Sequence, residues 1–263
     1  MLSPMPNAIG LFATVSDLLP LDDMVLAPWI REGLDRVVLE HTRRDELLAR
    51  GLRPARKLLF TGRPGTGKTM ASGALALAVG LPMFRVELHG VIASHMGETA
   101  ANLAKIFEHV RSMPAVYLFD EFDALGTDRS SVGGEAAGAE MRRTVNSLLQ
   151  FIEDDRSESL IVAATNHGHM LDTAIFRRFD EMIAFETLTL VEMIALIERA
   201  LGDFDAQTLD YGVIFEANPK LGHADLCAVL DRVRKDHVLV GKPINTQGLV
   251  AGVRRRSRAE AVT

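Results

Sequence analysis

One eight-residue segment combines glycines, a lysine and a threonine in a spacing suited to holding phosphate groups. Residues 62–69 read Gly-Arg-Pro-Gly-Thr-Gly-Lys-Thr and fit the pattern G-x-x-x-x-G-K-[ST] in full. The glycines let backbone N–H groups turn toward phosphate oxygens, and the next helix adds its positive N-terminal end. We expect Lys68 to reach the β- and γ-phosphates and the Thr69 hydroxyl to bind Mg²⁺. The predicted nucleotide-binding residues here are Gly62, Pro64, Gly65, Thr66, Gly67, Lys68, Thr69 and Met70.

Two adjacent acids follow a second apolar run. Residues 115–119 read Ala-Val-Tyr-Leu-Phe, and Asp120 and Glu121 come directly after them. A strand that ends in two acids can deliver carboxylates to the phosphate site. We expect Asp120 to hold Mg²⁺, directly or through water, and Glu121 to orient the attacking water.

An amide stands at the end of a third apolar run, in Ala164-Thr165-Asn166. The Asn166 amide can hydrogen-bond both the attacking water and a γ-phosphate oxygen, which predicts a sensor role. The alternative is a simple turn, because Asn-His-Gly favours turns.

Two arginines, Arg177 and Arg178, lie 11 and 12 residues past Asn166. A guanidinium group neutralises the spread charge of a transferring phosphoryl group. We expect at least one of them to serve the nucleotide site of a neighbouring subunit, since their own site is out of reach. The alternative is a surface ion pair with Asp180 or Glu181.

Short apolar runs alternate with amphipathic segments through the first two thirds of the chain, which predicts a parallel sheet covered by helices on both faces. The motifs fall at the carboxyl ends of the predicted strands, where ligands of such sheets bind. Predicted strands are 57–61, 83–86, 115–119, 160–164 and 182–185; predicted helices are 21–50, 70–79, 99–110 and 140–153, with a loop at 126–138.

After residue 189 the pattern is helical only, with predicted helices at 190–201, 226–240 and 246–253. We therefore divide the chain into an N-terminal arm (1–20), an α/β nucleotide-binding domain (21–188) and a small helical lid with a basic tail (189–263). The tail, Arg254-Arg255-Arg256-Ser257-Arg258, reads as a frayed, solvated end, with a phosphate-binding role as the alternative.

Composition favours an ordinary globular protein. The 263 residues include 48% hydrophobic and 24% charged residues, with a formal net charge of −6, which argues against a dedicated duplex-DNA or membrane-surface binder. The single cysteine, Cys227, excludes an internal disulfide and is expected in the core. With neither a signal peptide nor an apolar stretch of spanning length, the sequence predicts a cytoplasmic protein.

In this order the motifs resemble those of the AAA+ ATPases, most closely the classical AAA branch, as a small single-ring bacterial-type member. Residues 62–69 look like Walker A, 117–125 like Walker B, 163–166 like sensor 1, and 171–181 like the second region of homology with its arginine fingers. The resemblance implies an ATP hydrolase with ATP and Mg²⁺ as cofactors, a P-loop NTPase fold with a helical lid, and a homo-oligomeric ring, expected to be a hexamer, with nucleotide at the subunit interfaces.

The resemblance extends to three further segments. His95 and Met96 occupy the place of the first pore loop, where a client chain would be gripped, with a plain strand-to-helix loop as the alternative. Residues 222–226 resemble the sensor 2 region, with His223 where glycine is typical; His223 either approaches the nucleotide or makes a helix N-terminal contact only. The segment near 23–25 would help to hold adenine.

The resemblance also suggests what the ATPase does: it couples ATP binding and hydrolysis to remodelling of a protein client. Possible partners are a protease-associated protein and a HORMA-type signalling protein, as handled by the pachytene-checkpoint class of remodellers. The rival hypotheses are a nucleic-acid-associated loader or translocation ATPase, which predicts a basic pore, and a metabolite kinase, which predicts an acceptor pocket.

Overall fold

The computed structural model describes residues 10–16, 18–88, 98–122, 134–168 and 173–260. They fold as two compact units. The first contains residues 1–24, 28–62 and 68–184, and the second contains residues 25–27, 63–67 and 185–263. The phosphate-loop residues 63–67 therefore cluster with the C-terminal helices, although they follow directly on a strand of the first unit.

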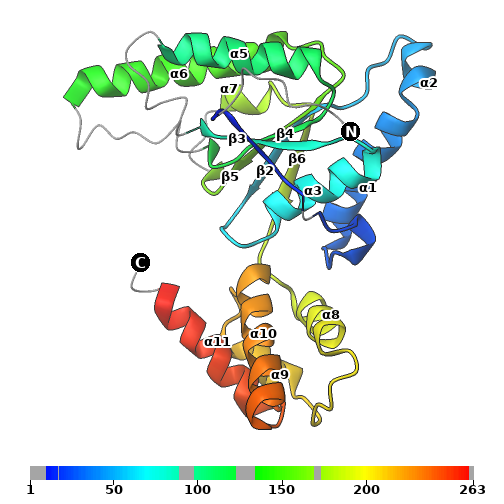
Figure 1. Ribbon diagram of the computed structural model, residues 1–263, viewed down its shortest axis with the longest axis vertical. Helices are drawn as coiled ribbons and strands as arrows, with labels where there is room; N and C mark the ends of the chain where they lie inside the picture. Colours follow the sequence, from blue (N-terminus) through cyan, green and yellow to red (C-terminus); the bar gives the residue numbers. More distant parts are fainter. Residues whose placement is uncertain (1–9, 17, 89–97, 123–133, 169–172, 261–263) are drawn as a thin grey trace. The chain divides into compact units, whose positions relative to one another are not determined.

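A six-stranded sheet in the order β1-β3-β4-β5-β2-β6 forms the centre of the first unit (Figure 1). β3, β4, β5 and β2 pair in parallel, and the alignment of Thr61 with Thr165 and of Phe119 with Ala163 brings their carboxyl ends to one edge. Their bounds are β1 Phe12–Thr14, β2 Lys57–Gly62, β3 Met83–Val86, β4 Val116–Phe119, β5 Leu160–Thr165 and β6 Glu181–Phe185.

The predicted parallel pairing does not extend to β1. β1 pairs antiparallel with β3 at the edge of the sheet, inside the segment expected to be only an arm. The strand is three residues long, too short for periodicity to identify. Its Phe12 ring lies against Phe84 and Tyr117, so packing with distant aromatic side chains fixes its place.

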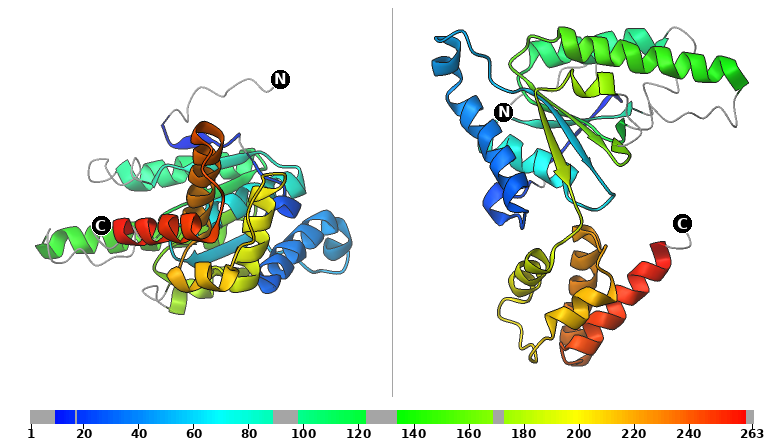
Figure 2. Two further views of the ribbon diagram at one scale, coloured as in Figure 1. Left: turned by 90° about the horizontal axis from the view of Figure 1, so that it is seen from below. Right: turned by 180° about the vertical axis from the view of Figure 1, so that it is seen from behind.

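Helices cover both faces of this sheet: α5, α6 and α7 lie on one side, and α1 and α3 on the other (Figures 1 and 2). The larger core joins the inner faces of α5 and α6 to β4 and β5 through side chains such as Phe107, Tyr117, Phe119 and Leu148. The bounds are η1 Leu21–Asp23, α1 Pro28–Thr42, α2 Arg44–Leu48, α3 Lys68–Val79, α5 Glu98–Ser112, α6 Gly134–Asp154 and α7 Thr173–Phe176.

Two helix predictions were wrong in their limits. The helix expected over 21–50 is three separate pieces, η1, α1 and α2. The loop expected to extend to 138 ends earlier, because α6 begins at Gly134. Residues 135–137 are Glu-Ala-Ala, good helix formers that outweigh the flanking glycines.

The second unit contains the helices α8 Leu190–Leu201, α9 Tyr211–Ala217, α10 His223–Val240 and α11 Thr246–Glu260. They enclose their own apolar core, which includes Ile197, Leu226 and Leu249. A capping box between Thr189 and Glu192 starts α8.

Three features of this unit correct the sequence predictions. α9 was not predicted, because seven residues give too little periodicity. The arginine run 254–258 is not frayed but helical, since α11 continues through it. Cys227 is exposed, because the buried positions of α10 include Leu226, Val229 and Leu230, which leave Cys227 on the outer face. Among the described residues, no helix is long and apolar enough to cross a membrane.

Candidate nucleotide-binding site

The phosphate loop connects the end of β2 to the start of α3. Gly65 and Gly67 have φ angles of +75° and +102°, which side-chain-bearing residues rarely adopt, so the tight course of the loop depends on them. The Thr66 hydroxyl donates to the Arg63 carbonyl at 2.8 Å. Because α3 begins at Lys68, its N-terminal N–H groups and positive dipole end adjoin the loop, which suits an anion.

The Lys68 side chain is buried and lies between the loop and the end of β5. Its ammonium group donates to the Gly62 carbonyl at 2.6 Å and to Asn166 Oδ1 at 2.8 Å. The two residues stand 98 positions apart in the sequence, and the parallel pairing of β2 with β5 brings them together. The predicted phosphate-binding lysine and the predicted sensor amide are therefore in direct contact.

Asp120 follows β4 and contacts the first turn of α3. The Thr69 hydroxyl donates to Asp120 Oδ2 at 3.0 Å, and the Glu121 amide donates to Asp120 Oδ1 at 3.0 Å. The two oxygens proposed as Mg²⁺ ligands are therefore adjacent, and the carboxylate is oriented by a backbone bond.

Glu121 has an unusual backbone. Its φ angle of +53° lies in the left-handed region, and it is the one non-glycine residue with positive φ in the described parts of the chain. Such a conformation costs about 1–3 kcal/mol in a residue that carries a side chain. The carboxylate is exposed at the strand end rather than buried, so it can meet solvent and ligand.

The adjacent arginines have different surroundings. Arg178 Nε lies 3.4 Å from Glu153 Oε2 of α6, and its Nη1 is buried without a hydrogen-bond partner among the described residues. Arg177 is exposed, and in the described parts of the chain no hydrogen bond or ion pair involves its side chain. The alternative, a surface ion pair with Asp180 or Glu181, is not seen in the described parts of the chain: Arg178 pairs with Glu153, and Asp180 Oδ2 accepts from the amides of Arg56 and Lys57 at 2.9 Å.

His223 starts α10 and contacts the segment expected to hold adenine. Its Nε2 lies 3.1 Å from the Val25 carbonyl, and its Nδ1 is buried with no hydrogen-bond partner in the described residues. Burial lowers the pKa of His223, against smaller raising effects of the Glu192 charge and the Val25 carbonyl. The imidazole is therefore neutral at pH 7, with Nε2 donating to the carbonyl and Nδ1 left as an acceptor.

The same end of α10 also touches the phosphate loop, within the second unit. The Ala224 amide donates to the Gly65 carbonyl at 3.0 Å. A Cβ on Gly222 would lie 3.2 Å from that carbonyl oxygen, which explains the glycine at the helix N-cap. Asp225 accepts from Arg256 Nε of α11 at 2.5 Å. Sequence reasoning missed this last pair, because the two residues are 31 positions apart and lie on different helices.

These features resemble one family of nucleotide-binding proteins. The model of the AAA family, the ATPase family associated with various cellular activities, matches residues 58–187. The chain contains an AAA ATPase domain.

Relatives of the AAA domain extend the comparison. The chain is 45% identical over 165 residues to the uncharacterised AAA family ATPase y4kL of Sinorhizobium fredii, covering 63% of this chain and 49% of that protein. It is 32% identical to the peroxisomal ATPase PEX6 of Penicillium chrysogenum, covering 59% of this chain and 11% of that one. The ATP-dependent zinc metalloprotease FtsH 1 of Sorangium cellulosum is 32% identical over 187 residues, which cover 69% of this chain and 30% of that protein. The chain thus spans about half or less of these relatives.

A solved structure supports the fold. The crystal structure of the FIGL-1 AAA domain superposes with a TM-score of 0.69 at 18% identity and covers 97% of this chain and 91% of that one. The predicted fold, an α/β AAA domain followed by helices, is confirmed. Pro64 and Met70 lie in the loop and on α3 as expected, whereas the predicted pore-loop residues His95 and Met96 lie outside the described residues.

Proposed function

We propose that this chain binds and hydrolyses ATP at the site formed by the phosphate loop, Asp120, Glu121 and Asn166. The contact of Lys68 with Asn166 carries the proposal, because it joins the phosphate-binding lysine to the polar end of β5. Hydrolysis needs positioning and charge stabilisation around the terminal phosphate more than covalent chemistry. Lys68 supplies the charge and Asn166 supplies an amide that can hold the attacking water.

The residues present fit a magnesium ion. Thr69 Oγ1 and Asp120 Oδ2 are hard oxygen ligands 3.0 Å apart, and Mg²⁺ in nucleotide sites uses one or two protein oxygens plus phosphate and water. The described residues contain no cluster of three or more His, Cys, Asp or Glu side chains that could hold a metal. When bound, Mg²⁺ supplies positive charge to the β- and γ-phosphates.

Glu121 is proposed as the residue that orients and polarises the attacking water. Its left-handed backbone and exposure support this role, because strained backbone at a strand end is typical of functional sites. The Glu121 backbone N–H donates a hydrogen bond to Asp120 Oδ1. This bond orients the Asp120 carboxylate at the start of the turn. Asp120 then faces Thr69, and Glu121 is assigned to the water.

Arg177 is proposed as the main arginine finger, acting on the nucleotide of a neighbouring subunit in a ring-shaped homo-oligomer. It is exposed, whereas Arg178 is directed to Glu153 of its own subunit. An exposed guanidinium without an internal partner keeps its charge for a phosphate across an interface. Arg178 is then a supporting residue that holds the turn after α7 against α6.

His223 is proposed to position the adenine-binding segment. Through Nε2 it fixes the Val25 carbonyl, and its free Nδ1 can accept a hydrogen bond from the nucleotide. The Ala224–Gly65 bond connects the same helix end to the phosphate loop. Nucleotide binding and the position of α10 are thereby coupled.

The work driven by this ATPase is proposed to be remodelling of a protein client, with an adaptor or partner protein. One relative is by name an ATP-dependent metalloprotease, which supports a protein as the client. The finer proposals for the partner are a protease-associated protein and a HORMA-type protein, and the lack of an arginine at the start of α10 counts against the second.

The test is ATP binding and phosphate release by the purified protein. Lys68→Ala should abolish binding, and Glu121→Gln should bind ATP but release little phosphate. Lys105→Ala, at an exposed lysine of α5, is the matched control and should behave as wild type. Normal ATP affinity in Lys68→Ala would refute the site. For the client, capture by Glu121→Gln should need ATP and disappear in the Lys68→Ala/Glu121→Gln double variant.

A further inference from the structure

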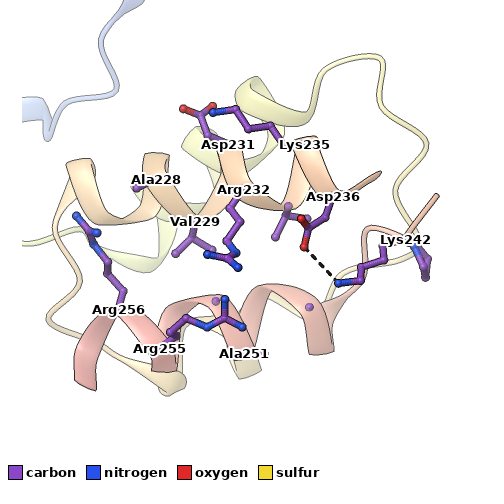
Figure 3. A pocket seen from close by; sticks show the side chains of 14 residues that line it. Ala228, Val229, Asp231, Arg232, Lys235, Asp236, Lys242, Ala251, Arg255 and Arg256 are labelled. Atoms are coloured by element: carbon purple, nitrogen blue, oxygen red, sulfur yellow. Dashed lines mark hydrogen bonds and ion pairs between the residues drawn. The ribbon is translucent and has the colours of Figure 1, made fainter. Parts of the chain in front are cut away.

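A basic groove lies between α10 and α11 of the second unit, and none of its lining residues is among those proposed for catalysis. It has a volume of about 670 Å³ and is lined from both helices (Figure 3). Its floor is made of small and apolar residues, because α11 contributes glycines and alanine at helical spacing opposite the aliphatic face of α10. The floor residues are Ala228, Val229, Val233, Gly248, Ala251 and Gly252.

The rim of the groove is strongly cationic. Lys242 and Arg256 line it but are paired, Lys242 with Asp236 at 3.4 Å and Arg256 with Asp225 at 2.5 Å. Arg232, Lys235 and Arg255 also line it, and these three are exposed. Within the described chain, no ion pair or hydrogen bond engages their side chains. Arg232 and Arg255 bring two like charges into the space between the helices, whereas Lys235 extends along the side of α10 away from α11 (Figure 3).

The arginine run of α11 extends this charge. Arg254, Arg255 and Arg258 line a second hollow on the same helix. Between residues 223 and 258 the sequence has eight Lys and Arg against three Asp, although the whole chain has a net charge of −6. A local excess of cations on an acidic protein costs self-repulsion and favours an anionic partner.

We propose that this groove binds an acidic segment of a partner protein that also carries aliphatic side chains. Arg232 and Arg255 face each other across the groove in Figure 3 and can each hold a carboxylate with two parallel N–H···O bonds. The apolar floor then accepts the intervening side chains. The segment would belong to the client or adaptor, so the partner's role rests on the proposed function, whereas the binding itself does not.

Two observations favour an acidic peptide over a nucleic acid. No aromatic ring lines the groove among the described residues, and single strands depend on aromatic side chains for stacking. The carboxylates of Asp231 and Asp236 also stand on the lining, where they would repel a continuous phosphate backbone but can accept peptide N–H groups.

The experiment measures anisotropy of a short fluorescein-labelled peptide of alternating Glu and Leu. Binding should weaken by at least about 100-fold in Arg232→Glu/Arg255→Glu, because two charge-assisted contacts are lost and two repulsive carboxylates are added. The matched control Lys105→Glu/Arg111→Glu makes the same charge change at exposed positions of α5 and should bind as wild type. A peptide of alternating Lys and Leu should not bind. Arg232→Gln/Arg255→Gln repeats the test without charge reversal.

An equal loss of peptide affinity in the groove and control variants would overturn the proposal, because the binding would then depend only on the net charge of the protein. Tighter binding of oligo-dT than of the peptide, lost in the same groove variant, would instead assign the groove to nucleic acid and would also overturn it. The measurement is made without ATP and repeated on Lys68→Ala, so it reads out independently of hydrolysis. ATP turnover of the groove variant should equal that of wild type.

Discussion

The two adjacent arginines should separate into one catalytic and one supporting residue. Arg177→Ala should leave folding unchanged but lower ATP turnover by about 10³-fold or more, the effect expected of an arginine finger. Arg178→Ala removes an ion pair of 3.4 Å whose side chains are 30% and 59% exposed. Solvent screening reduces such a pair to about 0.5 kcal/mol.

That energy corresponds to a fall in the melting temperature of about 1–2 °C for a chain of this size. The assays are phosphate release at saturating ATP and thermal unfolding, both on Arg177→Ala, Arg178→Ala and the exposed control Arg111→Ala. The reasoning would be refuted if Arg177→Ala kept its turnover while Arg178→Ala lost turnover without loss of stability. Equal catalytic losses in both variants would show that the exposure of Arg177 does not distinguish them.

Three further predictions concern stability. Glu121→Gly should raise the free energy of unfolding by about 1 kcal/mol, because glycine adopts the left-handed backbone without strain. ATP turnover should be lost in the same variant. Urea unfolding that shows no gain in the free energy of unfolding would contradict the proposed strain. Asp155→Ala should cost about 3 kcal/mol, because it removes the fully buried carboxylate that pairs with Arg56 at 3.0 Å, and Arg56→Met/Asp155→Ala should recover part of it. Burial lowers the pKa of His109, so the unfolded chain binds that proton more tightly. The melting temperature should therefore decrease as the pH is lowered below about 6.5, and His109→Phe should reduce this decrease.

The sequence was sufficient for the parts of the site that depend on local motifs. The strand–loop–helix around residues 62–69 is in its predicted place, and the pairing of parallel strands explains why Asn166 and Asp120 meet α3. A local motif identifies the strand and the helix that it connects. The order of the strands in the sheet then decides which strand ends lie next to one another.

Other features could not be predicted, because they depend on contacts between distant segments. The His223–Val25 contact joins residues 198 positions apart, and the left-handed φ of Glu121 leaves no mark in residue types. The basic run of α11 was misread as frayed because arginines at a chain end are usually solvated, whereas Val253 of the same helix is buried in a core. The groove between α10 and α11 could not be predicted, because it depends on how these two helices pack against each other.

The most direct test of the account is a mixing experiment with two inactive proteins. Arg177→Ala has an intact phosphate loop, and Lys68→Ala has an intact finger. Mixed oligomers should hydrolyse ATP well above the sum of the separate rates, because the arginine of one subunit completes the site of the next. Rates that merely add, in mixtures that native mass spectrometry shows to contain both proteins in one oligomer, would contradict the claim that the site is shared between subunits.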